Sequence, residues 1–193
     1  SEDLSFVDAC TEDHFRAMSL IHALGWRDTY RGYVPDEDMA REITDDRWVP
    51  TFRENLKTNR NQLLLLYDED IPVCCATFGP ARIDAGLQAG TVCKFNSRGY
   101  EGWGEIISFY THPDHKRKGY GTKLMEEVLR RLSGQLQRPP HICLQVFLFV
   151  LRENENARRF YEKMGFAWDG THEDIPFPPD TICVDLRYTR SLP

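Results

Sequence analysis

Long hydrophobic runs are missing from this 193-residue sequence, and so is any excess of positive charge. No stretch approaches the roughly 20 consecutive apolar residues that a transmembrane helix needs. The 30 Asp and Glu residues outnumber the 24 Lys and Arg residues, giving a net charge of −6, which argues against general nucleic-acid binding because such proteins are usually basic. The start, SEDLSFVDAC, lacks the basic and apolar regions of a signal peptide. We therefore expect a cytoplasmic protein that binds neither membranes nor nucleic acid.

The sequence also lacks cysteines and histidines at the spacing that binds a metal ion. The six cysteines are Cys10, Cys74, Cys75, Cys93, Cys143 and Cys183. None forms a C-x-x-C pair, and no histidine lies at zinc-finger spacing from a cysteine pair. Cys74, Cys75, Cys143 and Cys183 lie in apolar or strand-like segments, where a free cysteine behaves as a small core residue. We therefore expect reduced thiols and no metal site.

No repeat, low-complexity tract or linker divides the chain, so the sequence predicts a single domain over residues 1–193. The expected elements are a strand over 4–9, a helix capped by Thr11 that Gly25 can end, a helical region over 36–56, strands over 62–67, 71–78, 91–95 and 105–111, a helix over 122–132, a strand over 141–151, a helix over 154–164 and a strand over 181–188. This order fits an α/β fold whose sheet contains both parallel and antiparallel neighbours.

The most informative segment reads F-Y-T-H-P-D-H-K-R-K-G-Y-G-T and covers residues 109–122. It runs from a strand through a proline-containing turn and a basic glycine-rich loop into a helix. Glycines let backbone N–H groups converge, and a helix N-terminus adds about half a positive charge. Lys116, Arg117 and Lys118 add to this positive field. The segment therefore suits a pyrophosphate group.

Two common nucleotide-binding motifs do not fit this segment. A Walker loop needs Gly-Lys followed by Ser or Thr, whereas Gly121 is followed by Thr122 and then Lys123. A dinucleotide fingerprint needs a third glycine, and Leu124 occupies that position. Both motifs are therefore excluded.

Two motifs together resemble the GNAT superfamily of acetyl-CoA-dependent N-acetyltransferases. In its loop motif, [QR]-x-x-G-x-[GA], Lys116 fills the Gln/Arg position, and Gly119 and Gly121 fill the glycine positions. The later motif, N-x-x-A-x-x-[FL]-Y-x-x-x-G-F, is matched by Asn154, Ala157, Phe160, Tyr161, Gly165 and Phe166. A looser similarity joins residues 26–32 to the W-R-x-x-Y-x-G segment of bacterial members. Clear resemblance covers about residues 104–168.

The resemblance implies a mixed, mostly antiparallel central sheet flanked by helices, with a splayed parallel strand pair holding the CoA. The CoA-binding core would lie at about 104–168 within one N-acetyltransferase domain. The implied cofactor-binding residues are Phe109, Tyr110, Thr111, Lys116, Arg117, Lys118, Gly119, Tyr120, Gly121, Thr122, Asn154 and Ala157. The strand backbone at 109–111 would pair with the pantetheine amides as an added strand does. Asn154 would bind the pantetheine arm, cap its own helix, or do both.

Catalysis by such an enzyme needs two proton transfers. An alkylammonium has a pKa of roughly 10, so it must lose a proton before it attacks the thioester, and the leaving thiolate gains one. The resemblance implies that Tyr161 is the general acid, although a core aromatic is the structural alternative. Glu105 is the candidate base, with a strand-end surface charge as its alternative; His112 as a base and Ser108 as a water-aligning residue are less favoured.

The acceptor is less well defined by the sequence. Trp26 and Tyr30 are candidates for the acceptor cleft. The acidic residues 36–38 could attract an amine, but acidic residues at a helix start need no such explanation. Small-molecule amines and peptide amines both fit, and the acidic net charge favours a cationic small molecule. Family members are often dimers, so a homodimer is one expected state.

The expected function is direct transfer of the acetyl group of acetyl-CoA, the cosubstrate, to a primary amine. A ping-pong route through a cysteine is disfavoured because none lies in the two motifs. The alternatives are a non-catalytic CoA-binding or regulatory module and an acyltransferase that uses a longer acyl-CoA.

Overall fold

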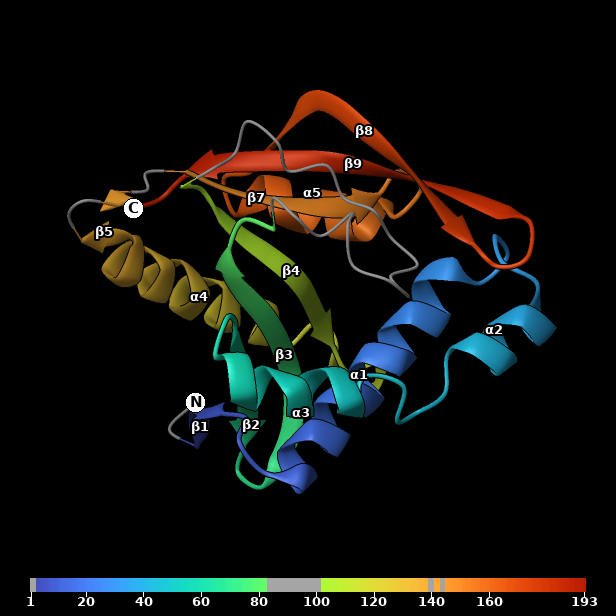
Figure 1. Ribbon diagram of the computed structural model, residues 1–193, viewed down its shortest axis with the longest axis horizontal. Helices are drawn as coiled ribbons and strands as arrows, with labels where there is room; N and C mark the ends of the chain where they lie inside the picture. The colour runs from blue at the N-terminus through green and yellow to red at the C-terminus, as the bar shows by residue number, and fades with distance from the viewer. Residues whose placement is uncertain (1–2, 83–101, 139–140, 143–144) are drawn as a thin grey trace. The chain divides into compact units, whose positions relative to one another are not determined.

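The computed structural model describes residues 3–82, 102–138, 141–142 and 145–193 (Figure 1). Its elements are β1 (Leu4–Asp8), α1 (Glu12–Tyr30), α2 (Asp36–Glu42), α3 (Val49–Thr58), β2 (Gln62–Asp68), β3 (Ile71–Pro80), β4 (Gly104–Thr111), the 3-10 turn η2 (Pro113–His115), α4 (Tyr120–Leu136), β5 (Gln137–Arg138), β6 (His141–Ile142), β7 (Gln145–Leu151), α5 (Glu155–Lys163), β8 (Ala167–Phe177) and β9 (Thr181–Ser191). Across these ranges, no helix combines the length and apolar character needed to cross a bilayer.

The chain forms two compact units. The first comprises Ser1–Phe78 and Ser108–Val128, and the second comprises Gly79–Ile107 and Leu129–Pro193. The boundaries fall inside β3, β4 and α4, so each of these elements contributes to both units.

The main sheet has the strand order β1-β2-β3-β4-β7-β9-β8, and β5 and β6 pair separately. Antiparallel ladders join β1 to β2, β2 to β3, β7 to β9 and β8 to β9. One pair, β4 and β7, is parallel, with Gly104–Ile106 in register with Val146–Leu148. The connection between these two strands contains α4, in keeping with the long crossover that a parallel pair requires. The predicted mixed, mostly antiparallel α/β sheet is confirmed.

In the first unit, α1 begins where the sequence predicts. The Thr11 hydroxyl accepts a hydrogen bond from the backbone N–H of His14 at 3.2 Å, which satisfies a first-turn donor. The apolar side of the helix then packs into a core that contains Phe15, Met18, Ile21, Phe52, Leu63, Leu65 and Cys75. The apolar stripe that the sequence predicts for this helix, Ala17, Leu20, Ile21 and Leu24, is only partly the buried side: Ile21 is buried, whereas Leu20 is exposed.

The end of α1 differs from the prediction. Gly25 does not end the helix, which continues to Tyr30. A Cβ atom at Gly25 would lie 2.3 Å from the Tyr110 ring, so only glycine lets α1 come this close to β4. The glycine serves helix–strand contact instead of termination.

The helix predicted over 36–56 is two helices, α2 and α3. Contacts from α1 hold the intervening turn: the Ser19 hydroxyl donates to the Asp45 carbonyl at 2.7 Å and accepts from the Trp48 N–H at 3.1 Å. The Arg27 guanidinium also donates to the Ile43 carbonyl at 2.8 Å. Tertiary hydrogen bonds therefore satisfy backbone groups that a continuous helix would have paired internally.

In the second unit, α5 lies along β7 and β9 (Figure 1). The strand expected over 141–151 begins only at Gln145, and its first two residues belong to the short β6. The last strand extends to Ser191, beyond its predicted end. β8 was not predicted, because AWDGTHEDIPF is polar, carries Gly170 and Pro176, and forms an edge strand. The strand predicted over 91–95 lies outside the described residues.

Candidate active site

The turn after β4 is built on His112. Its ring Nδ1 accepts a hydrogen bond from the backbone N–H of Asp114 at 3.1 Å and so caps η2. The His112 N–H donates to the Val73 carbonyl at 2.8 Å, which fixes the turn to β3. The imidazole is thus used in shaping the turn, which does not favour it as a general base.

The basic loop that follows has two residues in the left-handed region, Arg117 with φ 65° and Gly119 with φ 80°. α4 then starts at Tyr120, and the Lys123 N–H donates to the Gly119 carbonyl at 3.2 Å. The preceding first-turn N–H groups have no acceptor within their helix. A Cβ atom at Gly119 would meet no atom within 4 Å. The loop therefore offers N–H donors beside open space, which is the arrangement that phosphate groups need.

Charged contacts fix the two ends of this loop. The Lys116 ammonium pairs with the Asp28 carboxylate of α1 at 2.8 Å, with both side chains about half exposed. At the other end, the Tyr120 hydroxyl donates to the Asp68 carboxylate, and this bond raises the pKa of Tyr120. Arg117 and Lys118 are exposed, so they present positive charge to a ligand at the loop.

The end of β4 carries three predicted cofactor-binding residues, Phe109, Tyr110 and Thr111, all half-buried. The Thr111 hydroxyl lies 3.3 Å from the Cys74 sulfur. The parallel register with β7 covers only Gly104–Ile106 of β4, so the backbone of Ser108–Thr111 lies outside that ladder.

The two predicted acceptor residues belong to an aromatic cluster of α1. The Trp26 and Tyr30 rings stack with centroids 4.5 Å apart, and Trp26 also lies 5.9 Å from Trp48. His22 stacks on Trp48 at 4.0 Å. Burial, with a smaller contribution from Arg47, lowers the pKa of His22 to about 3, so its imidazole is neutral at physiological pH.

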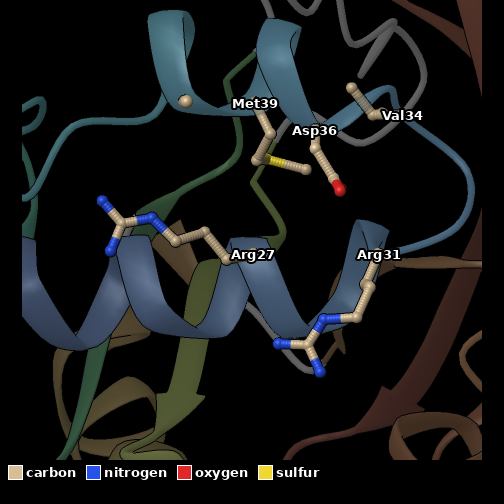
Figure 2. A pocket seen from close by; sticks show the side chains of 6 residues that line it. Arg27, Arg31, Val34, Asp36 and Met39 are labelled. Carbon is tan, nitrogen blue, oxygen red and sulfur yellow. The ribbon is translucent and has the colours of Figure 1, made fainter.

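A pocket of about 220 Å³ lies between the C-terminal part of α1 and α2 (Figure 2). Its lining residues are Arg27, Arg31, Val34, Asp36, Met39 and Ala40. Asp36 and Met39 point from α2 toward α1. The Arg27 guanidinium is held at 2.8 Å by the Asp45 carboxylate. Trp26 and Tyr30 are not among the lining residues, although they neighbour Arg27 and Arg31 on α1.

In the second unit, Asn154 caps α5 and Tyr161 lies within it. The Asn154 side-chain oxygen accepts from the Ala157 N–H at 3.2 Å, so the predicted helix cap is confirmed. Tyr161 is buried, with ring centroids 5.5 Å from Phe160 and 6.1 Å from Phe166. The ring thus has the packing role that the structural alternative described, and the role of its hydroxyl stays a prediction.

Glu105 is fully buried and paired with Arg82. Its carboxylate accepts from the Arg82 backbone N–H at 3.0 Å, from Nε at 3.1 Å to both oxygens, and from Nη2 at 2.6 Å. The alternative of a strand-end surface charge is therefore wrong. Nothing in the local sequence pointed to Arg82, because the two residues are 23 positions apart and meet only in the folded chain.

Sequence reasoning also missed the polar residues of β9. The fully buried Tyr188 hydroxyl accepts from Arg158 Nε at 2.9 Å and donates to Glu162 Oε2 at 2.7 Å. Asp185, on the same strand, is only 7% exposed. Their strand shows alternating apolar residues, and neither polar residue belongs to a motif that would have marked it.

Three of the four described cysteines are buried. Burial raises the pKa of the Cys74 thiol to about 12, that of Cys183 to about 11, and that of Cys75 well above its usual value. These thiols stay protonated at neutral pH and provide no thiolate nucleophile; Cys10 is exposed, and Cys93 and Cys143 lie outside the described residues. In the described part of the chain, no three His, Cys, Asp or Glu residues are grouped to hold a metal ion.

Solved structures with the same fold include several N-acetyltransferases. One from Staphylococcus aureus Mu50 superposes with a TM-score of 0.69 at 15% identity, covering 98% of this chain and 99% of that one. The PaiA N-acetyltransferase from Thermoplasma acidophilum, in complex with coenzyme A, gives 0.66 at 13% identity over 97% and 98% of the two chains. Spermidine N-acetyltransferase from Vibrio cholerae, in complex with CoA and spermine, gives 0.65 at 15% identity over 100% and 97%.

At such identities the structural similarities establish the fold alone. No curated protein sequence matches the chain. The sequence model of the acetyltransferase (GNAT) family matches residues 25–166, which include both motifs and most of the chain. This protein therefore belongs to the GNAT acetyltransferase family and is a transferase enzyme.

Proposed function

We propose that this protein transfers the acetyl group of acetyl-CoA directly to a primary amine. The observation that carries the proposal is the loop between η2 and α4, in a chain that the GNAT family model matches. In this loop, left-handed residues and a helix N-terminus present N–H donors beside open space, with exposed cationic side chains.

The donor would bind with its pyrophosphate on the N–H groups of residues 117–122. Arg117 and Lys118 add charge there, whereas Lys116 shares its charge with Asp28. The pantetheine arm would pair with the backbone at 109–111, which lies outside the parallel ladder. Asn154 uses its side-chain oxygen for the cap, so its amide NH₂ is the group for a pantetheine carbonyl or a bound water, with Ala157 beside it.

The chemistry needs no covalent enzyme intermediate, and the buried thiols support a direct route. The amine nitrogen attacks the thioester carbonyl, the C–S bond breaks, and Tyr161 protonates the leaving thiolate. Glu105 would hold Arg82 in position and would not act as the general base, because its oxygens already accept four hydrogen bonds from Arg82.

The acceptor would be a small cationic amine. The net charge of −6 favours cations, and stacked Trp26 and Tyr30 offer aromatic faces that attract an alkylammonium. The spermidine N-acetyltransferase among the similar structures acts on such an amine. A homodimer stays a prediction, to be checked by light scattering.

The test is thiol release from acetyl-CoA over a panel of butylamine, spermidine, lysine and a peptide with a free N-terminus. We expect amine-dependent release of CoA and a stoichiometric N-acetyl product by mass spectrometry. Calorimetric binding of acetyl-CoA without release on any amine would identify a non-catalytic module. Faster release from butyryl-CoA than from acetyl-CoA would identify an acyltransferase for longer chains.

A further inference from the structure

The polar side chains of β9 divide between the two faces of the second unit's sheet. Tyr188 contacts Arg158 and Glu162 of α5 through its hydroxyl, so its face is the one that α5 covers. Successive strand residues point to opposite faces. Asp185 and Arg187 therefore lie on the other face, which we call the far face.

The strand registers identify the neighbours of Asp185 on the far face. Leu151 of β7 and Glu173 of β8 are paired directly with it. Phe149 is paired with Arg187, and Phe147, two residues before Phe149 in β7, is paired with Glu105 of β4. The far face thus holds several charged groups beside an apolar row from β7, all within one compact unit.

Three carboxylates of the second unit have an arginine partner. Glu105 is paired with Arg82, Asp169 with Arg187 at 2.8 Å, and Glu153, which follows β7, with Arg152 at 2.7 Å. Asp185 differs from them, because its Oδ1 atom is buried and has no hydrogen-bond partner among the described residues. Burial without a partner strongly disfavours a charged carboxylate.

Burial and one neighbouring carboxylate influence the ionisation of Asp185. Burial raises the pKa of Asp185 to about 7, and the nearby Glu153 adds to this effect. A carboxylate that titrates close to neutral pH has the proton affinity that a general base requires.

Asp185 also lies beside the turn that leads into α5. Its register partner Leu151 is the last residue of β7, and the Arg152 N–H donates to the carbonyl of the adjacent Val184 at 2.9 Å. Asn154, a proposed pantetheine contact, caps α5 three residues after Leu151. Within the second unit, Asp185 is thus placed beside the turn that leads to Asn154, the proposed pantetheine contact.

We propose that Asp185, and not Glu105, binds the acceptor amine and removes its proton. This inference rests on the proposed acetyl transfer. Glu153 is more exposed than Asp185 and would draw a cationic amine toward it.

Each proton in the reaction has a donor and an acceptor. The Asp185 carboxylate takes one proton from R–NH₃⁺ and becomes a carboxylic acid, which later releases that proton to solvent. The free amine forms the C–N bond while the C–S bond breaks. The second proton lost by nitrogen balances the one that the thiolate acquires through Tyr161, giving the amide and CoASH.

The test compares the wild type with Asp185→Asn, which keeps the side-chain volume and removes the base. The acceptor is the amine from the panel above that gives the fastest thiol release. For the wild type we expect kcat/KM to rise with pH through about 7. For Asp185→Asn we expect a loss of about 10²- to 10⁴-fold and no such rise, with acetyl-CoA affinity within twofold of the wild type.

The matched control is Glu173→Gln, which removes a neighbouring charge from the same face. It should keep kcat/KM within about threefold of the wild type and retain the rise of kcat/KM with pH through about 7. An Asp185→Asn enzyme within threefold of the wild type, with the same pH profile, overturns the inference but not the acetyl transfer. A wild type that binds acetyl-CoA yet acetylates no amine overturns both.

A second measurement applies even if Asp185→Asn does not fold. In wild-type protein with ¹³C-labelled aspartate carboxyls, one resonance should titrate near pH 7. Addition of CoA and butylamine should move that titration to lower pH, because a bound ammonium stabilises the carboxylate. A midpoint that the amine does not change would make Asp185 a protonated core acid and overturn the inference.

Discussion

The ring of Tyr110 occupies the space that a side chain at Gly25 would fill. A Cβ atom there would lie 2.3 Å from Cδ1 and 2.9 Å from Cγ of the ring. The contact brings the middle of α1 against β4 at one of the residues proposed to bind the pantetheine arm. It also holds Tyr110 beside His22, with ring centroids 4.6 Å apart.

Gly25→Ala should therefore destabilise the protein. Overpacking of this kind costs about 1–3 kcal/mol, and the better helix propensity of alanine offsets roughly 1 kcal/mol. Urea unfolding followed by circular dichroism measures the net effect.

Gly134→Ala is the matched control for that substitution. Gly134 lies in α4 and is exposed, and a Cβ atom added to it would meet no atom within 4 Å. This variant should be as stable as the wild type or more stable. A Gly25→Ala protein as stable as the control would refute the close contact.

The pyrophosphate site is tested by Gly121→Asp. The substitution adds bulk and negative charge at the start of α4, where the proposed ligand is anionic. We expect acetyl-CoA affinity to fall at least tenfold by calorimetry. Gly134→Asp adds the same group near the other end of the helix and should leave the affinity unchanged. Equal affinities for the two variants would place the pyrophosphate elsewhere.

Tyr161→Phe tests the general acid. The change keeps the packing against Phe160 and Phe166 and removes only the hydroxyl. Loss of a general acid costs about 10²- to 10⁴-fold in rate, or roughly 3 to 5 kcal/mol of barrier, so kcat should fall while acetyl-CoA affinity and the melting temperature stay nearly constant.

Tyr188→Phe provides the contrasting variant. Its hydroxyl joins Arg158 to Glu162 in a buried network, so its removal should cost about 1–3 kcal/mol of stability. If Tyr161→Phe instead keeps kcat within threefold when chemistry is rate-limiting, Tyr161 is a packing residue and water supplies the proton.

His22 should make the protein sensitive to acid. Its pKa is lowered to about 3 in the folded state, against about 6.5 in the unfolded chain. The unfolded state therefore binds the extra proton between these values, and stability falls as pH drops from about 6.5 toward 3.

His22→Phe keeps an aromatic ring in the stack on Trp48 and removes the titration. The difference in unfolding free energy between variant and wild type should change in favour of the variant as pH falls from 7 to 4.5. Denaturant unfolding at several pH values measures this difference in unfolding free energy. Arg47, the charge that also disfavours protonation of His22, is left intact in both proteins. A pH-independent difference would contradict the assignment of a buried neutral imidazole.

Local sequence was sufficient wherever a structural feature depends on neighbouring residues. Thr11 and Asn154 are helix caps because their side chains reach N–H groups three residues ahead. The Lys116–Thr122 loop was recognisable because its glycines and cations are consecutive and open a helix. The Asn154–Phe166 motif was recognisable for the same reason, because its residues lie within one helix and the turn that ends it.

Features that depend on distant residues were not predictable in this way. α1 continues past Gly25 because this glycine is used for the contact with Tyr110. The break before α3 depends on Ser19 and Arg27, whose side chains bond to the backbone of the intervening turn. β8 is a strand because β9 pairs with it, despite a sequence that local rules would make a loop.

The sequence by itself determined the family and the residues of the basic glycine-rich loop, because consecutive positions encode both, and the order of the predicted elements indicated the sheet class. Only the tertiary structure decided the state of the two carboxylates. Glu105 meets Arg82 across 23 positions and is fully buried and paired. Asp185 enters the same face of the sheet without such a partner among the described residues. The physical reason is that a carboxylate's proton affinity depends on burial and on nearby charges, which the chain assembles only on folding.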